Sequence, residues 1–224
     1  MTAFENNLAE LAGAFAGDGW ISRGNSGLTL FISGNPKDER NYYDNRIVPL
    51  LNETFKVKIR AREFRYWGTY GILTCNKNIL ESFLKLGFTV GKKVASVKVP
   101  TIILRNNTLY KHFLRGLFDT DGCIYFQRSY GSSSSKWQKE YRHRPVVAFA
   151  TVSLSLYREI CRMVNCLGFN FYKTKPYKGR TNKNLVYRLR IEGKENVKRW
   201  FSLINPASKK HLDRFNIWLK EGYF

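Results

Sequence analysis

The stretch Leu11-Ala-Gly-Ala-Phe-Ala-Gly-Asp18-Gly19 occurs a second time as Leu114-Arg-Gly-Leu-Phe-Asp-Thr-Asp121-Gly122, 103 residues further along the chain. Five of the nine positions are identical, and a weaker echo follows each copy at 91–93 and 208–210. Self-similarity of this kind indicates a repeated structural unit. We therefore divide the chain into a first half at residues 1–98, a linker at 99–107 that contains Pro100, and a second half at 108–224.

Hydrophobic periodicity predicts the same order of elements in both halves. Each half reads as αββαββα, so the fold class is α+β, with a pseudo-twofold pair of antiparallel, saddle-shaped sheets that carry helices on one face. In the first half we expect helices at 5–18, 38–54 and 78–86 and strands at 20–24, 28–33, 57–66 and 70–75. In the second half we expect helices at 108–121, 155–167 and 194–204 and strands at 123–130, 144–152, 169–177 and 184–191.

Small residues line one face of each repeated helix. Gly13 and Gly17 lie four residues apart, and Gly116 and Thr120 take the matching places in the second copy. Residues at this spacing share a helical face, and small side chains let two helix backbones approach closely. We therefore expect the two helices to pack together, with their carboxyl-terminal ends side by side.

This packing would bring Asp18 and Asp121 together at two helix ends that already carry partial negative charge. A divalent cation between the two carboxylates would reverse the repulsion, and the free carbonyls of Gly17 and Thr120 would be further ligands. The alternative is that each Asp-Gly is an ordinary helix cap, with the glycine in the left-handed conformation. A glycine cap does not require an aspartate before it. Because both copies of the motif have this aspartate, the pattern favours a metal site.

The paired motif resembles that of the LAGLIDADG homing endonucleases, and the order of elements extends this resemblance from about Leu8 to Pro206. The resemblance implies a monomer in which Asp18 and Asp121 hold Mg²⁺ or Mn²⁺ and cut one phosphodiester in each DNA strand across the minor groove, leaving short 3′ overhangs. It also implies that Ca²⁺ binds without supporting cleavage. The first copy departs from the motif at Ala16, where the second keeps an acidic residue, Asp119. We expect Asp119 to be a helix-face residue rather than a ligand.

Members of this family often place a basic or amide residue near the scissile phosphate. Lys37 and Asn35 stand at the matching place in the first half, although Asp38 and Glu39 make an ordinary helix start equally compatible with this segment. The second half has no lysine in the matching segment 150–155. Its basic residue is left open among Arg144, Lys136 and Lys139.

The charge of the chain points to a polyanionic partner. The formal net charge is +21, with 14 Lys and Arg against 9 Asp and Glu in residues 1–100, net +5, and 24 against 8 in the remainder, net +16. Nucleic acid is the leading partner for such a charge. A membrane is disfavoured because no run of 18 apolar residues exists.

The four cysteines lack C-x-x-C pairs, which disfavours a zinc finger. The polar first residues predict an intracellular protein, in the cytoplasm or nucleoid of a prokaryote or in an organelle.

Basic and amide side chains recur along the expected strands at mostly two-residue spacing, which places them on one face of a β-ribbon that fits the major groove. Most contacts of such side chains go to the phosphate backbone, so phosphate binding and base readout remain open for each residue. The candidate DNA contacts are Arg23, Asn25, Asn35, Arg60, Arg62, Arg65, Trp67, Gln127, Arg128, Arg144, Lys173, Lys175, Lys178, Arg180, Arg188 and Arg190.

The sequence therefore predicts a site-specific endonuclease with catalytic residues Asp18, Asp121 and Lys37, which cuts a target of about 20 base pairs and supports the mobility of its own intron or intein gene. Two alternatives remain open. One is a splicing maturase that binds intron RNA, and the other is a DNA-binding protein without catalysis.

Overall fold

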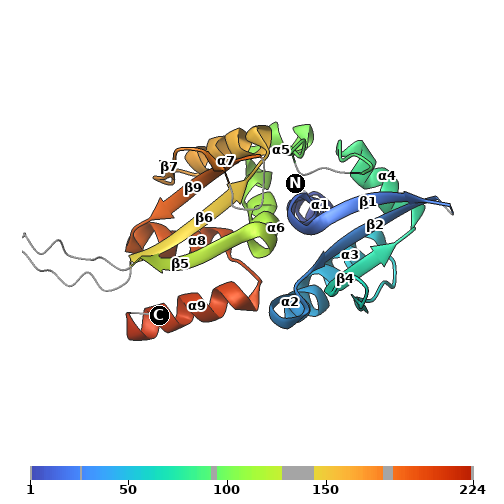
Figure 1. The fold of residues 1–224 in the computed structure, drawn as a ribbon, viewed down its shortest axis with the longest axis horizontal. Helices are drawn as coiled ribbons and strands as arrows, with labels where there is room; N and C mark the ends of the chain where they lie inside the picture. Colours follow the sequence, from blue (N-terminus) through green and yellow to red (C-terminus); the bar gives the residue numbers. More distant parts are fainter. Residues whose placement is uncertain (1, 26, 92–94, 128–143, 179–183, 223–224) are drawn as a thin grey trace, which may run out of the picture.

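The computed structural model describes residues 2–25, 27–91, 95–127, 144–178 and 184–222, and Figure 1 shows its two halves side by side. The elements of the first half follow the predicted order. They are α1 (Ala3–Asp18), β1 (Gly19–Gly24), β2 (Gly27–Gly34), α2 (Pro36–Tyr42), a π-helical turn (Tyr43–Ile47), α3 (Val48–Phe55), β3 (Arg62–Phe64), β4 (Thr69–Thr74) and α4 (Lys77–Lys85).

The second half repeats this order and adds a helix at its end. The segment expected to be the linker contains the short helix α5 (Thr101–Leu104), and a 3-10 turn (Asn107–Leu109) leads into the repeat. The elements that follow are α6 (Tyr110–Asp121), β5 (Gly122–Gln127), β6 (Arg144–Thr151), α7 (Leu154–Cys166), β7 (Tyr172–Lys173), β8 (Tyr177–Lys178), β9 (Leu185–Glu192), α8 (Lys194–Ile204) and α9 (Lys209–Glu221).

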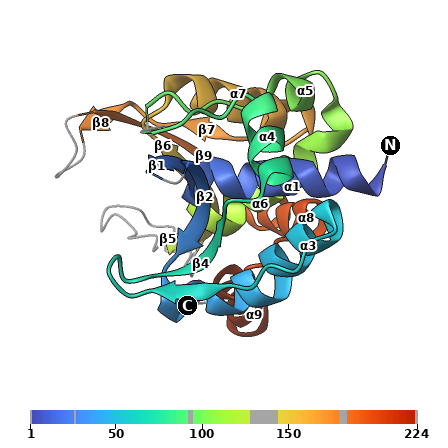
Figure 2. The same ribbon diagram turned by 90° about the vertical axis from the view of Figure 1, so that its right-hand side faces the viewer.

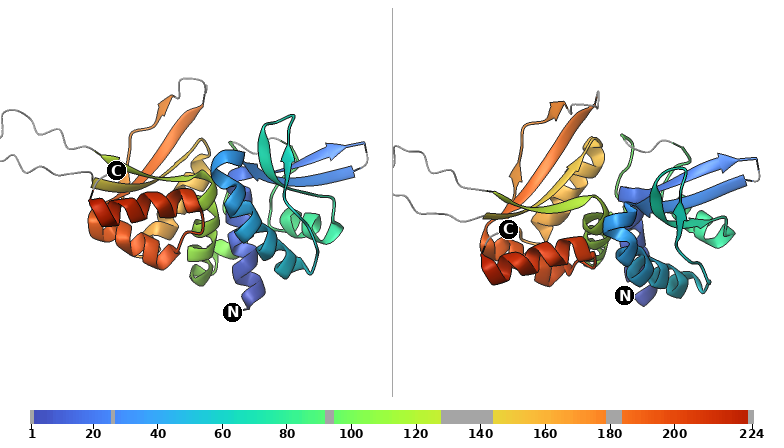
Figure 3. Two further views of the ribbon diagram at one scale, coloured as in Figure 1. Left: turned by 90° about the horizontal axis from the view of Figure 1, so that it is seen from below. Right: turned by 60° about the horizontal axis from the view of Figure 1, so that its bottom comes forward.

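The strands form one sheet in each half. The order is β1-β2-β4-β3 in the first sheet and β5-β6-β9-β7 in the second, where β8 also pairs with β9. All pairings between these strands are antiparallel. Figures 2 and 3 show the helices gathered on one side of the sheets, so that the opposite faces are free. The α+β class and the two antiparallel sheets predicted from the sequence are confirmed.

Two predicted strands are much shorter than expected. In the segment 57–66 only Arg62–Phe64 is a strand, because the Asn52 side chain bonds both the N–H and the carbonyl of Ile59, at 2.8 and 2.9 Å, and so occupies groups that a neighbouring strand would need. The segment 169–177 is divided between two short strands, and Pro176 stands between them. Proline has no N–H for a sheet ladder. The expected strand 123–130 is described only as far as Gln127.

The helices α1 and α6 lie against each other at the centre of the molecule. A Cβ added to Gly13 would lie 2.0 Å from the Phe113 carbonyl oxygen, and one added to Gly116 would lie 2.0 Å from the Glu10 carbonyl oxygen. The two backbones are therefore in direct contact at both glycines. The close approach predicted from the small residues is confirmed.

A buried carboxylate ties the two halves together beside this contact. Glu10 of α1 is 1% exposed and accepts hydrogen bonds from Arg46 of its own half, at 2.6 Å to Nε, and from Arg115 of α6, at 3.1 Å. Arg115 also donates from Nε to the Ile204 carbonyl at the end of α8, at 2.7 Å. A buried charge is tolerated only when it is paired and hydrogen-bonded in this way.

In the described ranges, no helix has the length and apolar composition needed to cross a lipid bilayer.

Candidate metal centre and nucleic-acid interface

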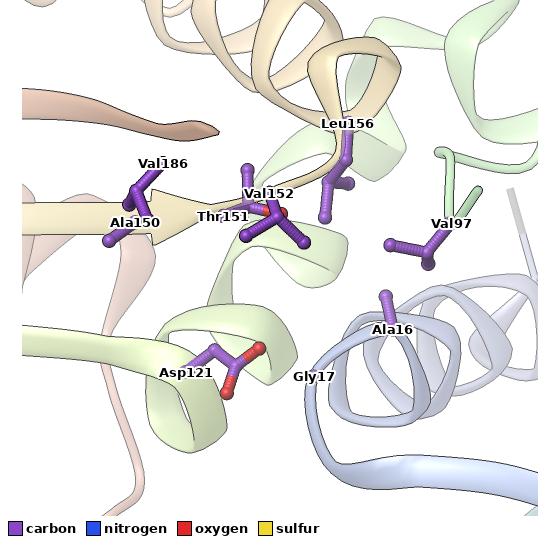
Figure 4. A pocket seen from close by; sticks show the side chains of 9 residues that line it. All are labelled: Ala16, Gly17, Val97, Asp121, Ala150, Thr151, Val152, Leu156 and Val186. Carbon is purple, nitrogen blue, oxygen red and sulfur yellow. The ribbon is translucent and has the colours of Figure 1, made fainter. Parts of the chain in front are cut away.

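The carboxyl-terminal ends of α1 and α6 meet where each helix turns into the first strand of its sheet. Asp18 and Asp121 are the last residues of the two helices. A Cβ added to Gly17 would lie 2.2 Å from Thr120 Oγ1 and 3.3 Å from Asp121 Cγ, so the two ends are in contact. Figure 4 shows the Asp121 carboxylate on the side of α6 that faces Gly17. The structure therefore brings the two predicted carboxylates to one place.

Gly19 and Gly122 follow the two aspartates, but neither is a left-handed cap. Their φ/ψ angles are −89/155° and −77/166°, which is extended backbone, and each begins a strand. An added Cβ would lie 2.2 Å from the ring of Phe15 in the first case and 2.2 Å from the ring of Phe118 in the second. Glycine is needed because an aromatic ring fills the space, and the alternative of a cap in the left-handed conformation does not hold.

Asp18 lies in a crowded, half-buried position. Tyr43, in the π-helical turn, donates a hydrogen bond to Asp18 Oδ2 at 2.9 Å. Glu39 approaches from α2, since a Cβ added to Gly34 would lie within 2.9 Å of both Glu39 Oε2 and Asp18 Oδ2. Burial, and then the charges of Glu39 and Asp121, raise the pKa of Asp18 to about 7, although the Tyr43 hydrogen bond and the Lys210 charge oppose this shift.

The basic residue expected at the start of α2 does not reach this carboxylate in the structure. Lys37 is exposed, and its backbone N–H is bound at 2.9 Å by the side chain of Asn35, which caps α2. The acidic Glu39, one turn into the helix, faces Asp18 instead. Its partner is Lys210 of α9, whose ammonium forms an ion pair with Glu39 and donates to the Thr120 carbonyl at 3.2 Å. Sequence reasoning missed both residues.

Asp121 has different surroundings. It is exposed and lines a hollow of about 240 Å³ whose other walls are mostly apolar, including Ala16, Val97, Leu156 and Val186 (Figure 4). Glu39 and Tyr43 are the fourth and eighth residues counted from the start of α2. The fourth and eighth residues of α7, the matching helix of the second half, are Tyr157 and Cys161. Tyr157 stacks on Tyr187 of β9, with ring centroids 5.5 Å apart.

The paired carboxylates suit a hard divalent cation. Mg²⁺ is usually bound in proteins by one or two carboxylates together with waters and substrate phosphates. Two carboxylates from two helix ends match this donor set, and a cation there would relieve the crowding that raises the pKa of Asp18. No cluster of three or more His, Cys, Asp or Glu able to hold a metal occurs within the described residues. The Thr120 carbonyl accepts a hydrogen bond from Lys210 at 3.2 Å and has a second lone pair that a cation could use.

The free face of the second sheet carries several of the candidate DNA contacts. Gln127 lies opposite Arg144 in the register, and Arg188 and Arg190 lie opposite Ala150 and Ala148 of the same strand. All four side chains therefore share the face opposite the buried Leu189 and Ile191. Lys173 and Lys178 lie opposite Leu189 and Leu185 instead, on the side of the helices, and Lys175 is exposed between the two strands. Arg128, Arg180, Lys136 and Lys139 lie outside the described residues.

The free face of the first sheet is aromatic rather than basic. Trp20 stacks on Phe31 with ring centroids 4.6 Å apart, and Trp67, from the turn after β3, packs edge-on against both rings at 5.8 and 5.4 Å. Phe64 completes this group, which we call the aromatic cluster. Arg62 shares the face and lies over the Phe64 ring. Asn25, Arg60 and Arg65 are exposed, and Arg23 lines a hollow of about 700 Å³ together with Asp18.

Known proteins with a similar sequence or fold include DNA endonucleases. Residues 108–205 match the family model described as a LAGLIDADG-like domain. Variants of the homing endonuclease I-DmoI superpose with a TM-score of 0.61 at 16% identity, covering 93% of this chain and 100% of theirs. The meganuclease I-AabMI gives 0.59 at 13% identity, covering 96% and 90%. The chain therefore has the fold of these endonucleases, and residues 108–205 are similar to the LAGLIDADG-like domain.

Two archaeal proteins resemble the chain in sequence. A replication factor C small subunit from Methanocaldococcus jannaschii is 25% identical over 94% of this chain, and a tRNA-splicing ligase RtcB from Methanopyrus kandleri is 25% identical over 88%. The chain spans only 10% and 20% of the lengths of these two relatives.

Within the second copy of the repeated motif, Asp119 has a role that its sequence position did not reveal. The side chain is fully buried, and its carboxylate accepts the backbone N–H groups of Ala207 and Ser208, at 2.8 and 3.0 Å, where α9 begins. Burial raises the pKa of Asp119 to about 7 even though these two bonds lower it. In the first half the motif has Ala16, and the matching backbone at Gly91 donates to the Ile21 carbonyl of β1 instead, at 2.8 Å.

Proposed function

We propose that this protein is a site-specific DNA endonuclease that makes a metal-dependent double-strand break. The observation that carries the proposal is the meeting of Asp18 and Asp121 at the ends of two helices in contact, each leading into a sheet whose other face is free. A nuclease that cuts both strands needs an acidic group for each phosphodiester. The pseudo-twofold arrangement supplies the two groups from one chain, so we expect a monomer.

Double-stranded DNA is the substrate that the charge and the fold support. The net charge of +21 favours a polyanion, and the arginines on the free face of the second sheet are spaced for a groove. I-DmoI was solved in complex with DNA and Ca, and with DNA and Mn, and I-AabMI bound to uncleaved DNA. These complexes favour DNA over intron RNA as the partner, and we expect Mg²⁺ or Mn²⁺ to support cleavage while Ca²⁺ supports binding only.

The chemistry proposed is hydrolysis. A water oxygen forms a bond to phosphorus, the bond to the O3′ or O5′ leaving oxygen breaks, and the leaving oxygen takes up a proton. A bound Mg²⁺ would activate the water and stabilise the leaving oxygen. The protein residues hold this arrangement: Asp18 and Asp121 provide the metal ligands, Tyr43 fixes the orientation of the Asp18 carboxylate, and the contact at Gly17 sets the distance between the two helix ends.

The length of the sheets sets the length of the target. Among the described residues, the longest strands are β2, β6 and β9, with 8 residues each. At a rise of about 3.3 Å per residue such a strand spans about 26 Å, or about 8 base pairs at about 3.4 Å each. Two sheets with the central step between them would then cover about 20 base pairs.

The two archaeal relatives support a role in gene mobility. One is called a replication factor subunit and the other a tRNA-splicing ligase, yet the same chain matches a small part of each. A segment shared by proteins with such different names does not account for either named activity. An endonuclease gene that moves with an intron or intein would produce this distribution.

The test is cleavage of duplex DNA that spans the insertion site of the gene itself. We expect Asp18→Asn and Asp121→Asn to abolish double-strand cleavage in Mg²⁺ while binding in Ca²⁺ is largely retained, because the lost groups hold metal rather than the duplex. Asp213→Asn is the matched control, since this aspartate is exposed on α9 and pairs with Lys209. Full cleavage by either active-centre variant would exclude the proposed mechanism.

A further inference from the structure

The second sheet carries an acidic side chain on its free face. Among the described residues of its strands, Glu192 is the only Asp or Glu. It is the last residue of β9, which lies beside β6 (Figure 1), and Val146 is opposite to it in the register. Arg190 and Arg188 precede it by two and four residues and therefore share its face. A carboxylate on this face repels DNA phosphates, although it belongs to the more basic half of the chain.

Glu192 is paired with Arg190. Its carboxylate accepts a hydrogen bond from Arg190 Nη2, and the two side chains are 23% and 27% exposed, so the pair is partly shielded from water. The Nε of Arg190 is buried and has no hydrogen-bond partner among the described residues. An arginine presents five N–H donors in a planar fork. The guanidinium is therefore held at one corner, while other donors are left for a second acceptor.

Arg188, the neighbouring arginine of the face, is restrained in a different way. It donates from Nη2 to the Tyr177 hydroxyl at 2.7 Å, and its Cζ lies 5.3 Å from the centroid of the same ring. This partner is neutral, whereas the partner of Arg190 is an anion. Arg188 is nearer to the active centre, because it lies opposite Ala150, which lines the hollow beside Asp121. A separation of two residues along a strand is about 6.6 Å, or about two base pairs.

We propose that Glu192 determines specificity, because its carboxylate orients Arg190 towards the O6 and N7 acceptors of one guanine in the major groove and keeps it from binding a phosphate. This inference rests on the proposed endonuclease function. A fixed arginine fork suits the paired acceptors of guanine. An unrestrained arginine is used more often on the backbone, which receives most protein–DNA hydrogen bonds. The negative charge of Glu192 offsets the attraction of Arg190 for a phosphate, so the pair gains affinity only where base acceptors match its donors.

The competing explanation is that the pair only stabilises the end of β9. The variants Glu192→Gln, Arg190→Ala and their combination separate the two explanations. Glu195→Gln is the matched control, because Glu195 is an exposed glutamate of α8 that pairs with Lys198 of the same helix. It changes the net charge of the protein by the same amount as Glu192→Gln.

The first measurement is the salt dependence of binding to duplex DNA of unrelated sequence, in Ca²⁺. Once Glu192 is neutral, Arg190 can bind a phosphate and release one more counterion. We therefore expect Glu192→Gln to bind this DNA more tightly and to steepen the slope of log K against log salt by about 0.9. The combination with Arg190→Ala should return the slope to that of the wild type, and Glu195→Gln should leave it unchanged.

The second measurement uses a duplex that spans the insertion site of the gene, in which each guanine in turn is replaced by 7-deazaguanine. This analogue keeps Watson–Crick pairing but lacks the N7 acceptor. We expect the wild type to lose about tenfold in affinity at one guanine in the half-site of the second sheet. At that position Arg190→Ala and Glu192→Gln should each lose less than about threefold, while both respond like the wild type at the other guanines.

The outcomes are distinguishable. If Glu192→Gln keeps the wild-type salt slope and the wild-type guanine pattern, Glu192 has no role in specificity. If Arg190→Ala responds to every guanine as the wild type does, or if the wild type responds to none, Arg190 reads no guanine and the proposal is overturned. If Glu192→Gln is thermally less stable and recovers the wild-type pattern at a temperature where it is fully folded, the pair is a brace. Neither measurement depends on cleavage, so normal cleavage by Asp18→Asn would reveal a separate failure, that of the endonuclease mechanism.

Discussion

Replacing Gly116 by alanine should separate the two central helices and reduce both stability and cleavage. The new Cβ would lie 2.0 Å from the Glu10 carbonyl oxygen and 2.7 Å from the Ala14 nitrogen, and both atoms belong to the α1 backbone. Ordinary contact begins at 3.4 Å, so the helices must move apart by about 1.4 Å, the difference between these distances. No flexible side chain can yield in their place.

The expected loss in the free energy of unfolding is about 3 kcal/mol, the upper end of the usual range for overpacking, because the clash is with backbone and the whole interface opens. Cleavage should fall further, by about 100-fold, since a displacement of about 1 Å at a catalytic group has this effect. Gly13→Ala should behave in the same way, because its Cβ would meet the Phe113 carbonyl oxygen at 2.0 Å.

The double variant provides the sharper measurement. Once one methyl group has separated the helices, the second finds space, so Gly13→Ala with Gly116→Ala should cost at least about 1 kcal/mol less than the sum of the single changes. Urea unfolding of the four proteins gives this coupling, and Gly24→Ala is the control because nothing lies within 4 Å of its added Cβ. A Gly116→Ala protein within about 0.5 kcal/mol of the wild type would refute the reasoning.

Three further predictions follow from other parts of the structure. Burial lowers the pKa of His211 to about 3, so the unfolded chain binds the proton first, and the contribution of His211 to stability should fall by about 2 kcal/mol between about pH 6.5 and about pH 5. Asp18 and Asp119, with pKa values of about 7, change stability in the opposite direction over this range, so the measurement is the difference in pH dependence of urea unfolding between the wild type and His211→Phe. Replacing thymine by uracil in the half-site of the first sheet should weaken binding about fourfold per methyl in contact with the aromatic cluster, and Trp67→Ala should remove this sensitivity. Because Asp18 is enclosed and Asp121 exposed, the two strands should be nicked at different rates, and equal rates in a supercoiled-plasmid time course would argue against this difference.

The parts of the molecule that the sequence predicted are those encoded by local or repeated patterns. The central helix pair follows from glycines spaced four apart in two copies, and the sheets follow from alternating hydrophobicity. The predictions that failed depended on a single side chain that competes with the expected pairing. The Asn52 amide binds the Ile59 backbone and ends a predicted strand. In the same way, the Phe15 ring accounts for the glycine at Gly19, where the alternative of a left-handed cap does not hold.

The contacts around the candidate metal centre are harder to predict, because their partners are far apart in sequence. Glu39 and Lys210 are separated by 171 residues, and Asp119 lies 89 residues from the N–H of Ser208. No periodicity links such positions. The sequence pointed to Lys37, which is basic and close to the motif, whereas the structure brings a lysine from α9, a helix without a counterpart among the described residues of the first half.

The two halves have diverged in complementary ways, which only a fused chain permits. In a symmetric dimer, a carboxylate that mounts α9 would occur in both subunits, and both aspartates would share one environment. Here the first half keeps Ala16, a crowded Asp18 and an aromatic sheet face, while the second has Asp119, an exposed Asp121 and an arginine-rich sheet face. The cation at Asp18 comes from the second half and its acidic partner from the first, so neither half contains a complete centre. We therefore expect each half, produced alone, to lack cleavage even where it still binds DNA.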